Sequence, residues 1–384
     1  MSIEAPTRLP GATAPAERAL GPDLARGFML LFIALANTHY FLPGASVRGG
    51  YPQDGSGLDA AVIWLLSTFV DGRAFPMFGL LFGYGVAQIV RRQQDRGAWG
   101  VRRLLWRRSA VLVIVGLIDA VLFFAGDILA AYGVLLFAGV WLIFWKDRWL
   151  LVVAVAFLAL NALPSGDLSV ISTAGPDPSM LPPDFAAQVT HRVPAALYIA
   201  GLGLIGFLCP FALGLWAGRR RILEFPERHR RLLVAVAVTG LGSAVLGAQP
   251  IALLLSGVIP APDQQTLTWW AALHSTTGTF GGLGFAALIT LLARPRGPLT
   301  AAIAATGQRS MTCYLMQSVT WAVVFTPYLL DLSGTLTVVT TALLAAATWA
   351  ATVVIADRMR RAGQRGPFET LVRRFTYRPA QPRA

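Results

Sequence analysis

Apolar residues form ten long runs that are separated by short polar or basic connectors. A bilayer core of about 30 Å needs roughly 20 apolar residues in a helix, and most of these runs approach that length. We predict ten transmembrane helices over residues 24–43, 59–90, 104–124, 128–146, 148–163, 194–218, 231–255, 267–293, 300–326 and 335–357. This pattern is typical of an all-α polytopic membrane protein.

The run at 59–90 is long enough for two crossings, but polar residues interrupt it. Asp71, Gly72 and Arg73 lie near its middle, shortly before Pro76. Basic loops favour the cytoplasmic side of a membrane. One crossing, broken near residues 71–76, places every basic connector and both termini in the cytoplasm. Two crossings would place the N-terminus outside, so we expect the single broken crossing.

Composition and charge agree with this class. The 384 residues are 55% hydrophobic and 13% charged, with a net charge of +13. The arginines lie in short loops beside apolar runs, where membrane topology and contacts with lipid headgroups explain them without nucleic acid as a partner. We expect a multi-pass protein of the bacterial cytoplasmic membrane. It would have a flexible leader over 1–23, a membrane domain over 24–357 with an external loop at 164–191, and a basic tail over 358–384.

The first helix carries two polar side chains on one face. Asn37 follows Arg26 by eleven positions, which places the two within roughly 20° of each other on a helix. They can serve one polar cavity, because polar groups at membrane depth usually face the bundle interior. His39 points to nearly the opposite side. The alternative is that Arg26 marks the cytoplasmic edge and Asn37 joins two helices.

Further polar residues are predicted in the outer half of the bundle. Besides Asn37, they are Asp71, Arg73, Asp119, His274 and Gln317, with Asp127 at an outer hairpin. We expect an outer polar chamber with a basic inner approach at Arg26 and Arg309. Simpler roles are open for three of them. Asp71 can neutralise Arg73, Asp127 can cap the next helix, and His274 can bond a backbone group.

Two other spacings describe helix faces. Arg309, Cys313 and Gln317 recur every four residues and therefore share one face, which we expect to line a cavity. Glycines at both ends of residues 79–83 and of 278–282 predict close helix contacts. The two cysteines, Cys209 and Cys313, lie in apolar stretches and indicate neither a disulfide framework nor a metal site.

Several motifs in order along the chain resemble those of a known family. They are Arg26-Gly27 with Asn37, residues 75–85 (FPMFGLLFGYG), residues 126–129 (GDIL) with Tyr132, residues 307–318 (GQRSMTCYLMQS), and residues 366–369 (GPFE) with Thr376-Tyr377. Together they resemble the YeiB-like family of bacterial integral membrane proteins, known as domain of unknown function 418. The resemblance spans nearly the whole chain.

That family is similar to a distant branch of the transmembrane acyltransferase superfamily. The resemblance implies about ten core helices and transfer of an acyl group from cytoplasmic acyl-CoA to an extracytoplasmic acceptor. In those enzymes an arginine of the first helix is followed eleven residues later by a histidine. Arg26 matches the arginine, but Asn37 occupies the histidine position and cannot act as a general base. Cys313 stands where the family usually has asparagine.

The resulting functional hypothesis is a membrane acyltransferase with acyl-CoA as cosubstrate and no permanently bound cofactor. Its acceptor would be a glycan, a lipid or a small molecule. Arg26, Arg309 and Gln317 would bind the cosubstrate and Asn37 would orient the thioester, while His274, Asp71 or Asp127 would transfer protons. Two alternatives are a proton- or cation-coupled transporter or flippase using Asp71, Asp119 and Asp127, and a non-catalytic scaffold or sensor.

Overall fold

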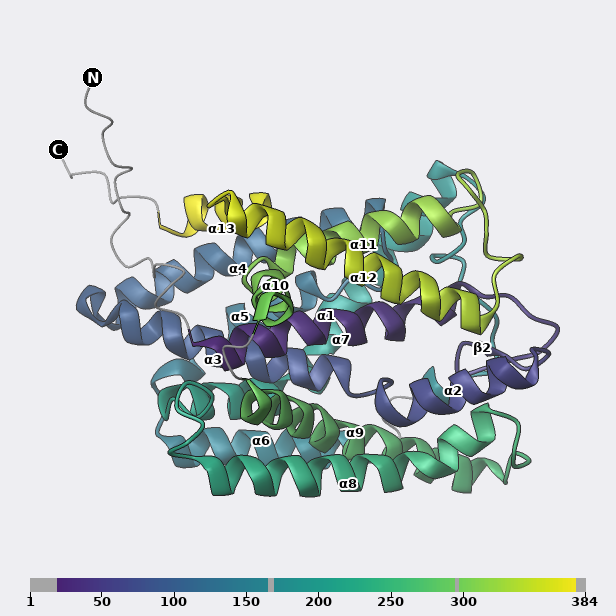
Figure 1. Ribbon diagram of the computed structural model, residues 1–384, viewed down its shortest axis with the longest axis horizontal. Coiled ribbons are helices and arrows are strands. Elements are labelled where there is room, and N and C mark those ends of the chain that lie inside the picture. The colour runs from purple at the N-terminus through teal and green to yellow at the C-terminus, as the bar shows by residue number, and fades with distance from the viewer. Residues whose placement is uncertain (1–18, 165–168, 294–296, 378–384) are drawn as a thin grey trace.

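The structure, a computed structural model, describes residues 19–164, 169–293 and 297–377, and about three quarters of these are helical (Figure 1). The helices are α1 Leu20–Thr38, α2 Gly57–Phe69, α3 Ala74–Arg92, α4 Gly97–Leu122, α5 Leu129–Gly139, α6 Asp147–Asn161, α7 Phe185–Arg219, α8 Arg230–Leu255, α9 Gln264–Leu292, α10 Gly297–Gln308, α11 Ser310–Phe325, α12 Val338–Arg361 and α13 Pro367–Thr376. Two short antiparallel strands, β1 Val47–Arg48 and β2 Tyr51–Pro52, lie in the α1–α2 connection. The predicted all-α fold is confirmed.

Six helical segments among the described residues are long and apolar enough to cross a membrane. They are Leu20–Phe41, Gly57–Arg92, Phe185–Arg219, Arg230–Leu255, Gln264–Leu292 and Val338–Arg361. Of the other predicted crossings, α5, α6, α10 and α11 have 11, 15, 12 and 16 residues. The longer α4 carries charged residues such as Arg107, Arg108 and Asp119. A membrane-type helical protein is supported, whereas ten crossings and their orientation remain predictions.

The predicted break of the second apolar run is present. Residues 70–73 separate α2 from α3, and Gly72 adopts a positive φ of 74°. Pro76 lies in the first turn of α3, where its missing N–H group costs no helical hydrogen bond. Both halves nevertheless form one 36-residue candidate span, in agreement with a single broken crossing.

Three predicted boundaries differ from the structure. The run at 300–326 is two helices, α10 and α11, because the chain leaves helical geometry at Arg309. The connection expected at 164–191 is shorter, because α7 already begins at Phe185 with the Asp184 carboxylate as its N-cap. The expected tail over 358–384 contains α13, a short amphipathic helix, and α12 continues to Arg361.

Close backbone contacts at glycines hold the central helices together. A Cβ atom on Gly83 would lie 2.2 Å from the carbonyl oxygen of Phe211, which fixes α3 against α7. On α9, Cβ atoms on Gly278 and Gly282 would each lie 2.7 Å from backbone oxygens in the α2–α3 break. Both glycine patterns predicted from the sequence are therefore confirmed as helix contacts. In Figure 1, α1 lies amid α3, α10 and α12, and α8 lies beside α9.

Candidate functional site

Nine arginine side chains of the described residues line one cavity of about 890 Å³. They come from α1, α3, α4, α12, α13 and the connections that follow α7, α10 and α12, and are Arg26, Arg91, Arg92, Arg108, Arg221, Arg309, Arg360, Arg365 and Arg373. The carboxylates in the same described lining are those of Asp23, Glu224 and Glu369. This excess of positive charge in a partly enclosed space favours an anionic ligand.

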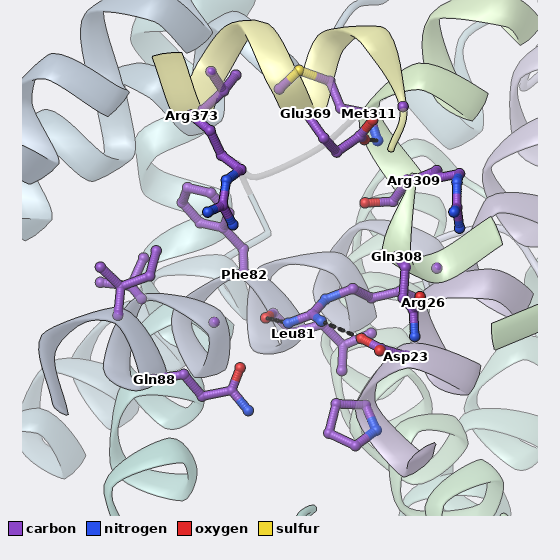
Figure 2. A pocket seen from close by; sticks show the side chains of 18 of the residues that line it. Asp23, Arg26, Leu81, Phe82, Gln88, Gln308, Arg309, Met311, Glu369 and Arg373 are labelled. Carbon is purple, nitrogen blue, oxygen red and sulfur yellow. Dashed lines mark hydrogen bonds and ion pairs between the residues drawn. The ribbon is translucent and has the colours of Figure 1, made fainter. Parts of the chain in front are cut away.

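Arg26 projects from the first turns of α1 into this cavity, as Figure 2 shows. Its Nη1 atom donates to Oδ1 of Asp23 at 3.1 Å, and Nη2 donates to the carbonyl oxygen of Leu81 at 3.2 Å. The two contacts fix the guanidinium between α1 and α3. Asn37 is half-buried further along α1, but the α1 residues that line the cavity end at Met29. The cavity therefore stops two helical turns short of Asn37, and the structure does not bring the two predicted partners together.

Arg309 lies at the break between α10 and α11 and also lines the cavity. Its guanidinium donates to the carbonyl oxygens of Ala305, at 3.1 Å, and Gln364, at 2.5 Å. Cys313 and Gln317 follow on α11 and are buried, and neither belongs to the described lining. The amide of Gln317 instead donates to the carbonyl oxygen of Leu30 at 3.2 Å. The predicted α11 face thus meets the cavity at Arg309 and then packs against α1.

The N-terminus of α11 is capped by the side chain of Glu369 from α13. Oε1 of Glu369 accepts the N–H groups of Met311 at 2.9 Å and of Thr312 at 3.1 Å. Oε2 accepts the Thr312 hydroxyl at 2.5 Å. These bonds satisfy N–H groups that the helix break leaves without helical partners. They also hold α13 against the cavity, into which Arg373 projects (Figure 2).

A second ion network forms the wall near α3 and the α7–α8 connection. Glu224 pairs with Arg91 at 2.7 Å and with Arg221 at 3.0 Å, and Gln88 donates to it at 3.0 Å. Burial raises the pKa of Glu224, but the hydrogen bonds from these three side chains hold it below its ordinary value. The carboxylate is therefore ionised at neutral pH and offsets part of the arginine charge.

Arg108 is a cavity arginine with a buried nitrogen atom that the described residues leave unsatisfied. It lies half-buried on α4, and its Nε atom is buried without a hydrogen-bond partner among the described residues. The positive charge of Arg26 acts on it unfavourably, whereas Tyr377 and Glu369 act on it favourably. Buried polar groups are normally hydrogen-bonded, so an anion between these guanidinium groups would supply what the protein leaves unsatisfied.

The inner part of the cavity is largely apolar. Its side chains come from α1, α3, α4 and α5, and are Met29, Phe78, Leu81, Phe82, Leu112, Leu129 and Tyr132. The Tyr132 hydroxyl is already engaged, because it donates to the carbonyl oxygen of Phe75 at 3.0 Å. A ligand with an anionic head and an apolar arm would match both regions.

Asp127 lies in the α4–α5 turn, just behind the cavity wall. It is 2% exposed and does not belong to the described lining. Its Oδ2 accepts the N–H group of Ala130 at 3.0 Å, as a helix-capping residue does. Its Oδ1 accepts the hydroxyl of Tyr314 at 3.0 Å, and Tyr314 lines the cavity.

Asp71 and His274 form a separate buried cluster at the α2–α3 break. The Arg73 guanidinium donates to the backbone oxygen of Asp71 and to that of Ala244. No ion pair joins the Arg73 and Asp71 side chains within the described ranges. Asp71 instead accepts the hydroxyl of Tyr51 at 2.7 Å.

Backbone oxygens hold the Arg73 guanidinium, so it makes no direct ion pair with the Asp71 carboxylate in the described part of the chain, although the charge of Asp71 still acts favourably on it. In the same cluster, Nε2 of His274 lies 2.9 Å from Arg73 and 3.0 Å from the carbonyl oxygen of Ser67. His39, which lies 4.0 Å from the ring of Tyr51, adds an aromatic stack. None of these residues belongs to the described lining of the cavity.

The structure adds candidate binding residues among arginines that the sequence analysis explains only by membrane topology. Arg91, Arg108 and Arg373 lie in basic segments that the positive-inside bias already explains. Arg108 follows Arg102, Arg103 and Arg107 on α4, so the sequence shows it only as one member of a basic segment. No comparable signal marks Arg373, whose position depends on how α13 docks.

Comparisons with known proteins agree with the predicted resemblance. A family model described as "Protein of unknown function (DUF418)" matches residues 217–379. The chain is also 28% identical over 406 aligned positions to the protein of Bacillus subtilis (strain 168) named "Uncharacterized protein YxaH", covering 94% of each chain. Residues 217–379 thus match the DUF418 family model, and the predicted resemblance to this family is confirmed over that part of the chain.

Proposed function

We propose that the arginine-lined cavity binds the phosphates of an acyl-CoA and that the protein is a membrane acyltransferase. The observation that carries this proposal is Arg108, a half-buried guanidinium whose Nε lacks a partner among the described residues and which lies in the field of Arg26. Arg26 and Arg108 carry like charges in a partly enclosed cavity, and an anion between them would reduce their repulsion.

The distribution of polarity favours this ligand class over a simple inorganic anion. The arginines surround the part of the cavity near the basic connections, and the apolar side chains of α1, α3 and α4 line its inner part. Acyl-CoA has several phosphates at one end and a slender arm with a thioester at the other. A cavity of about 890 Å³ lies within the size range of small-molecule sites.

The proposed catalytic residues differ in their relation to this cavity. Asp127 contacts a lining residue, Tyr314, so it is our first candidate for proton transfer to or from a bound ligand. Asn37, Asp71 and His274 lie outside the described lining, and their roles stay predictions. His274 as a base would also need Nε2 to leave Arg73 and Ser67.

The direct test is binding of CoA to the detergent-purified protein by isothermal titration calorimetry. Arg108→Gln is expected to weaken binding about tenfold, the effect of losing one charge-assisted hydrogen bond of roughly 1.5 kcal/mol. Arg107→Gln is the matched control, because Arg107 is exposed on the same helix and is not among the lining residues. Absence of CoA binding to the parent protein, or equal losses in both variants, would refute the assignment.

A transporter or flippase is the second candidate, favoured by the helix breaks at residues 70–73 and at Arg309. Interrupted helices are common where transporters bind substrates. Transfer of labelled acetyl from acetyl-CoA to membrane lipids or glycans separates the two. Binding with transfer supports the enzyme. Movement of an organic phosphate into proteoliposomes without transfer supports the transporter.

A further inference from the structure

Two carboxyl groups lie buried side by side behind the inner wall of the cavity. Asp119 of α4 is 0% exposed and Asp127 of the α4–α5 turn is 2% exposed. A Cβ atom on Gly116, three residues before Asp119 on the same helix face, would lie 2.6 Å from Oδ2 of Asp127. The two carboxyl groups are close enough for a hydrogen bond between them once one is protonated.

The two carboxyl groups differ in the number of hydrogen bonds that stabilise their ionised forms. Asp127 accepts one N–H group and one hydroxyl, from Ala130 and Tyr314. Asp119 accepts the Ser318 hydroxyl at 2.8 Å, and its Oδ1 has no hydrogen-bond partner among the described residues. Donors stabilise a carboxylate. Asp127 is therefore the better site for a negative charge, and Asp119 is the better site for a proton.

The surrounding charges do not neutralise a second anion. Arg192 of α7 is the positive group whose charge reaches Asp119. Its Nε donates to the carbonyl oxygen of Ser179 at 2.8 Å, and no ion pair joins it to either carboxyl group within the described ranges. The other titratable group facing the pair is Tyr314 of α11. Two adjacent carboxylates in such a dry site cannot both ionise at moderate cost.

We propose that Asp119 and Asp127 form a proton-binding site that holds one proton at neutral pH and exchanges it with the cavity through the hydroxyl of Tyr314. Tyr314 both contacts Asp127 and lines the cavity. The proton rests on Asp119. On release it moves to Asp127 and from there to the Tyr314 oxygen, as Tyr314 gives its own hydroxyl proton to an acceptor in the cavity. Each O–H bond that breaks is matched by one that forms, and uptake follows the same steps in reverse. The site does not depend on which ligand the cavity binds.

Infrared spectroscopy of the purified protein in detergent tests this site directly. We expect the carbonyl stretch of a dry, protonated carboxyl group at neutral pH. Asp119→Asn is expected to remove that band, whereas Asp127→Asn should retain it at a shifted frequency. Asp263→Asn is the control and should change nothing in this region, because Asp263 is an exposed N-cap whose carboxylate accepts from Thr266.

Two further measurements keep the proposal testable if Asp119→Asn does not fold. Ser318→Ala removes the hydroxyl that donates to Asp119 and is expected to shift the same band. Tyr314→Phe is expected to slow exchange of the carboxyl proton in deuterated buffer. A parent protein without the band, or a band that survives Asp119→Asn, would overturn the proton site. Unchanged exchange in Tyr314→Phe would overturn its connection to the cavity. None of these measurements uses CoA. Their outcome is therefore independent of whether the proposed CoA binding is correct.

Discussion

Glu369 holds the start of α11 at Thr312, accepting both the N–H group and the hydroxyl of that residue. The two residues are 57 positions apart, so this contact ties α13 to the helix break at Arg309. The same carboxylate lines the cavity. One side chain thus both completes a helix terminus and fixes one wall of the candidate site.

Glu369→Ala is expected to lower the free energy of unfolding by about 1–2 kcal/mol, because it removes a cap and leaves N–H groups of α11 unsatisfied. Thermal unfolding in detergent measures the loss. Limited proteolysis should also cleave residues 364–377 faster in the variant. Glu227→Gln is the control, since Glu227 is exposed in the α7–α8 connection. Protection equal to that of the parent would show that Glu369 does not hold α13.

Acid should weaken the Glu224 network. Its folded pKa lies below the ordinary value of 4.5. The stability that it contributes is therefore fully present above that ordinary value and is lost as pH falls through the lower folded value. We expect the melting temperature of the parent protein to decline below about pH 4.5, and Glu224→Gln to reduce the part of that decline due to this group. A variant with an identical acid profile and melting temperature would exclude the stabilising role.

The contact between α1 and α10 predicts a steric effect at Gly27. A Cβ atom there would lie 2.2 Å from the carbonyl oxygen of Ile303. Gly27→Ala is expected to cost about 1–3 kcal/mol through overpacking. Gly242→Ala is the matched control, because a Cβ atom at that helical glycine meets nothing within 4 Å. If both variants melt alike, the two backbones are not in tight contact.

The charge bias predicts that residues 95 and 175 lie on opposite sides of the membrane. Asp95 and Gly175 are both exposed, so cysteines at these positions are accessible to reagents. In a background without Cys209 and Cys313, we expect an impermeant maleimide added to intact cells to label position 175 and to spare position 95. Labelling of both positions from one side would reject the predicted topology.

Helix periodicity predicted the face of Arg26 correctly because side-chain direction on a helix is a local property. It could not predict how far the cavity extends along α1, which depends on neighbouring helices. Periodicity therefore places Asn37 beside Arg26, although the described lining of the cavity stops at Met29. The break at residues 70–73 was predicted from Gly72 and Pro76. The break at Arg309 has no proline, and it depends on the distant Glu369 carboxylate, which no local pattern shows.

Docking of α13 by Glu369 has a consequence for biosynthesis. Arg373 and Tyr377 complete the cavity wall, yet a ribosome makes them after every candidate membrane span. A nascent chain that has already inserted α1 to α12 would still expose the N-terminus of α11. The cavity wall would be complete only when α13 folds back, so anion binding should be stronger in chains that contain α13 than in chains arrested before residue 369.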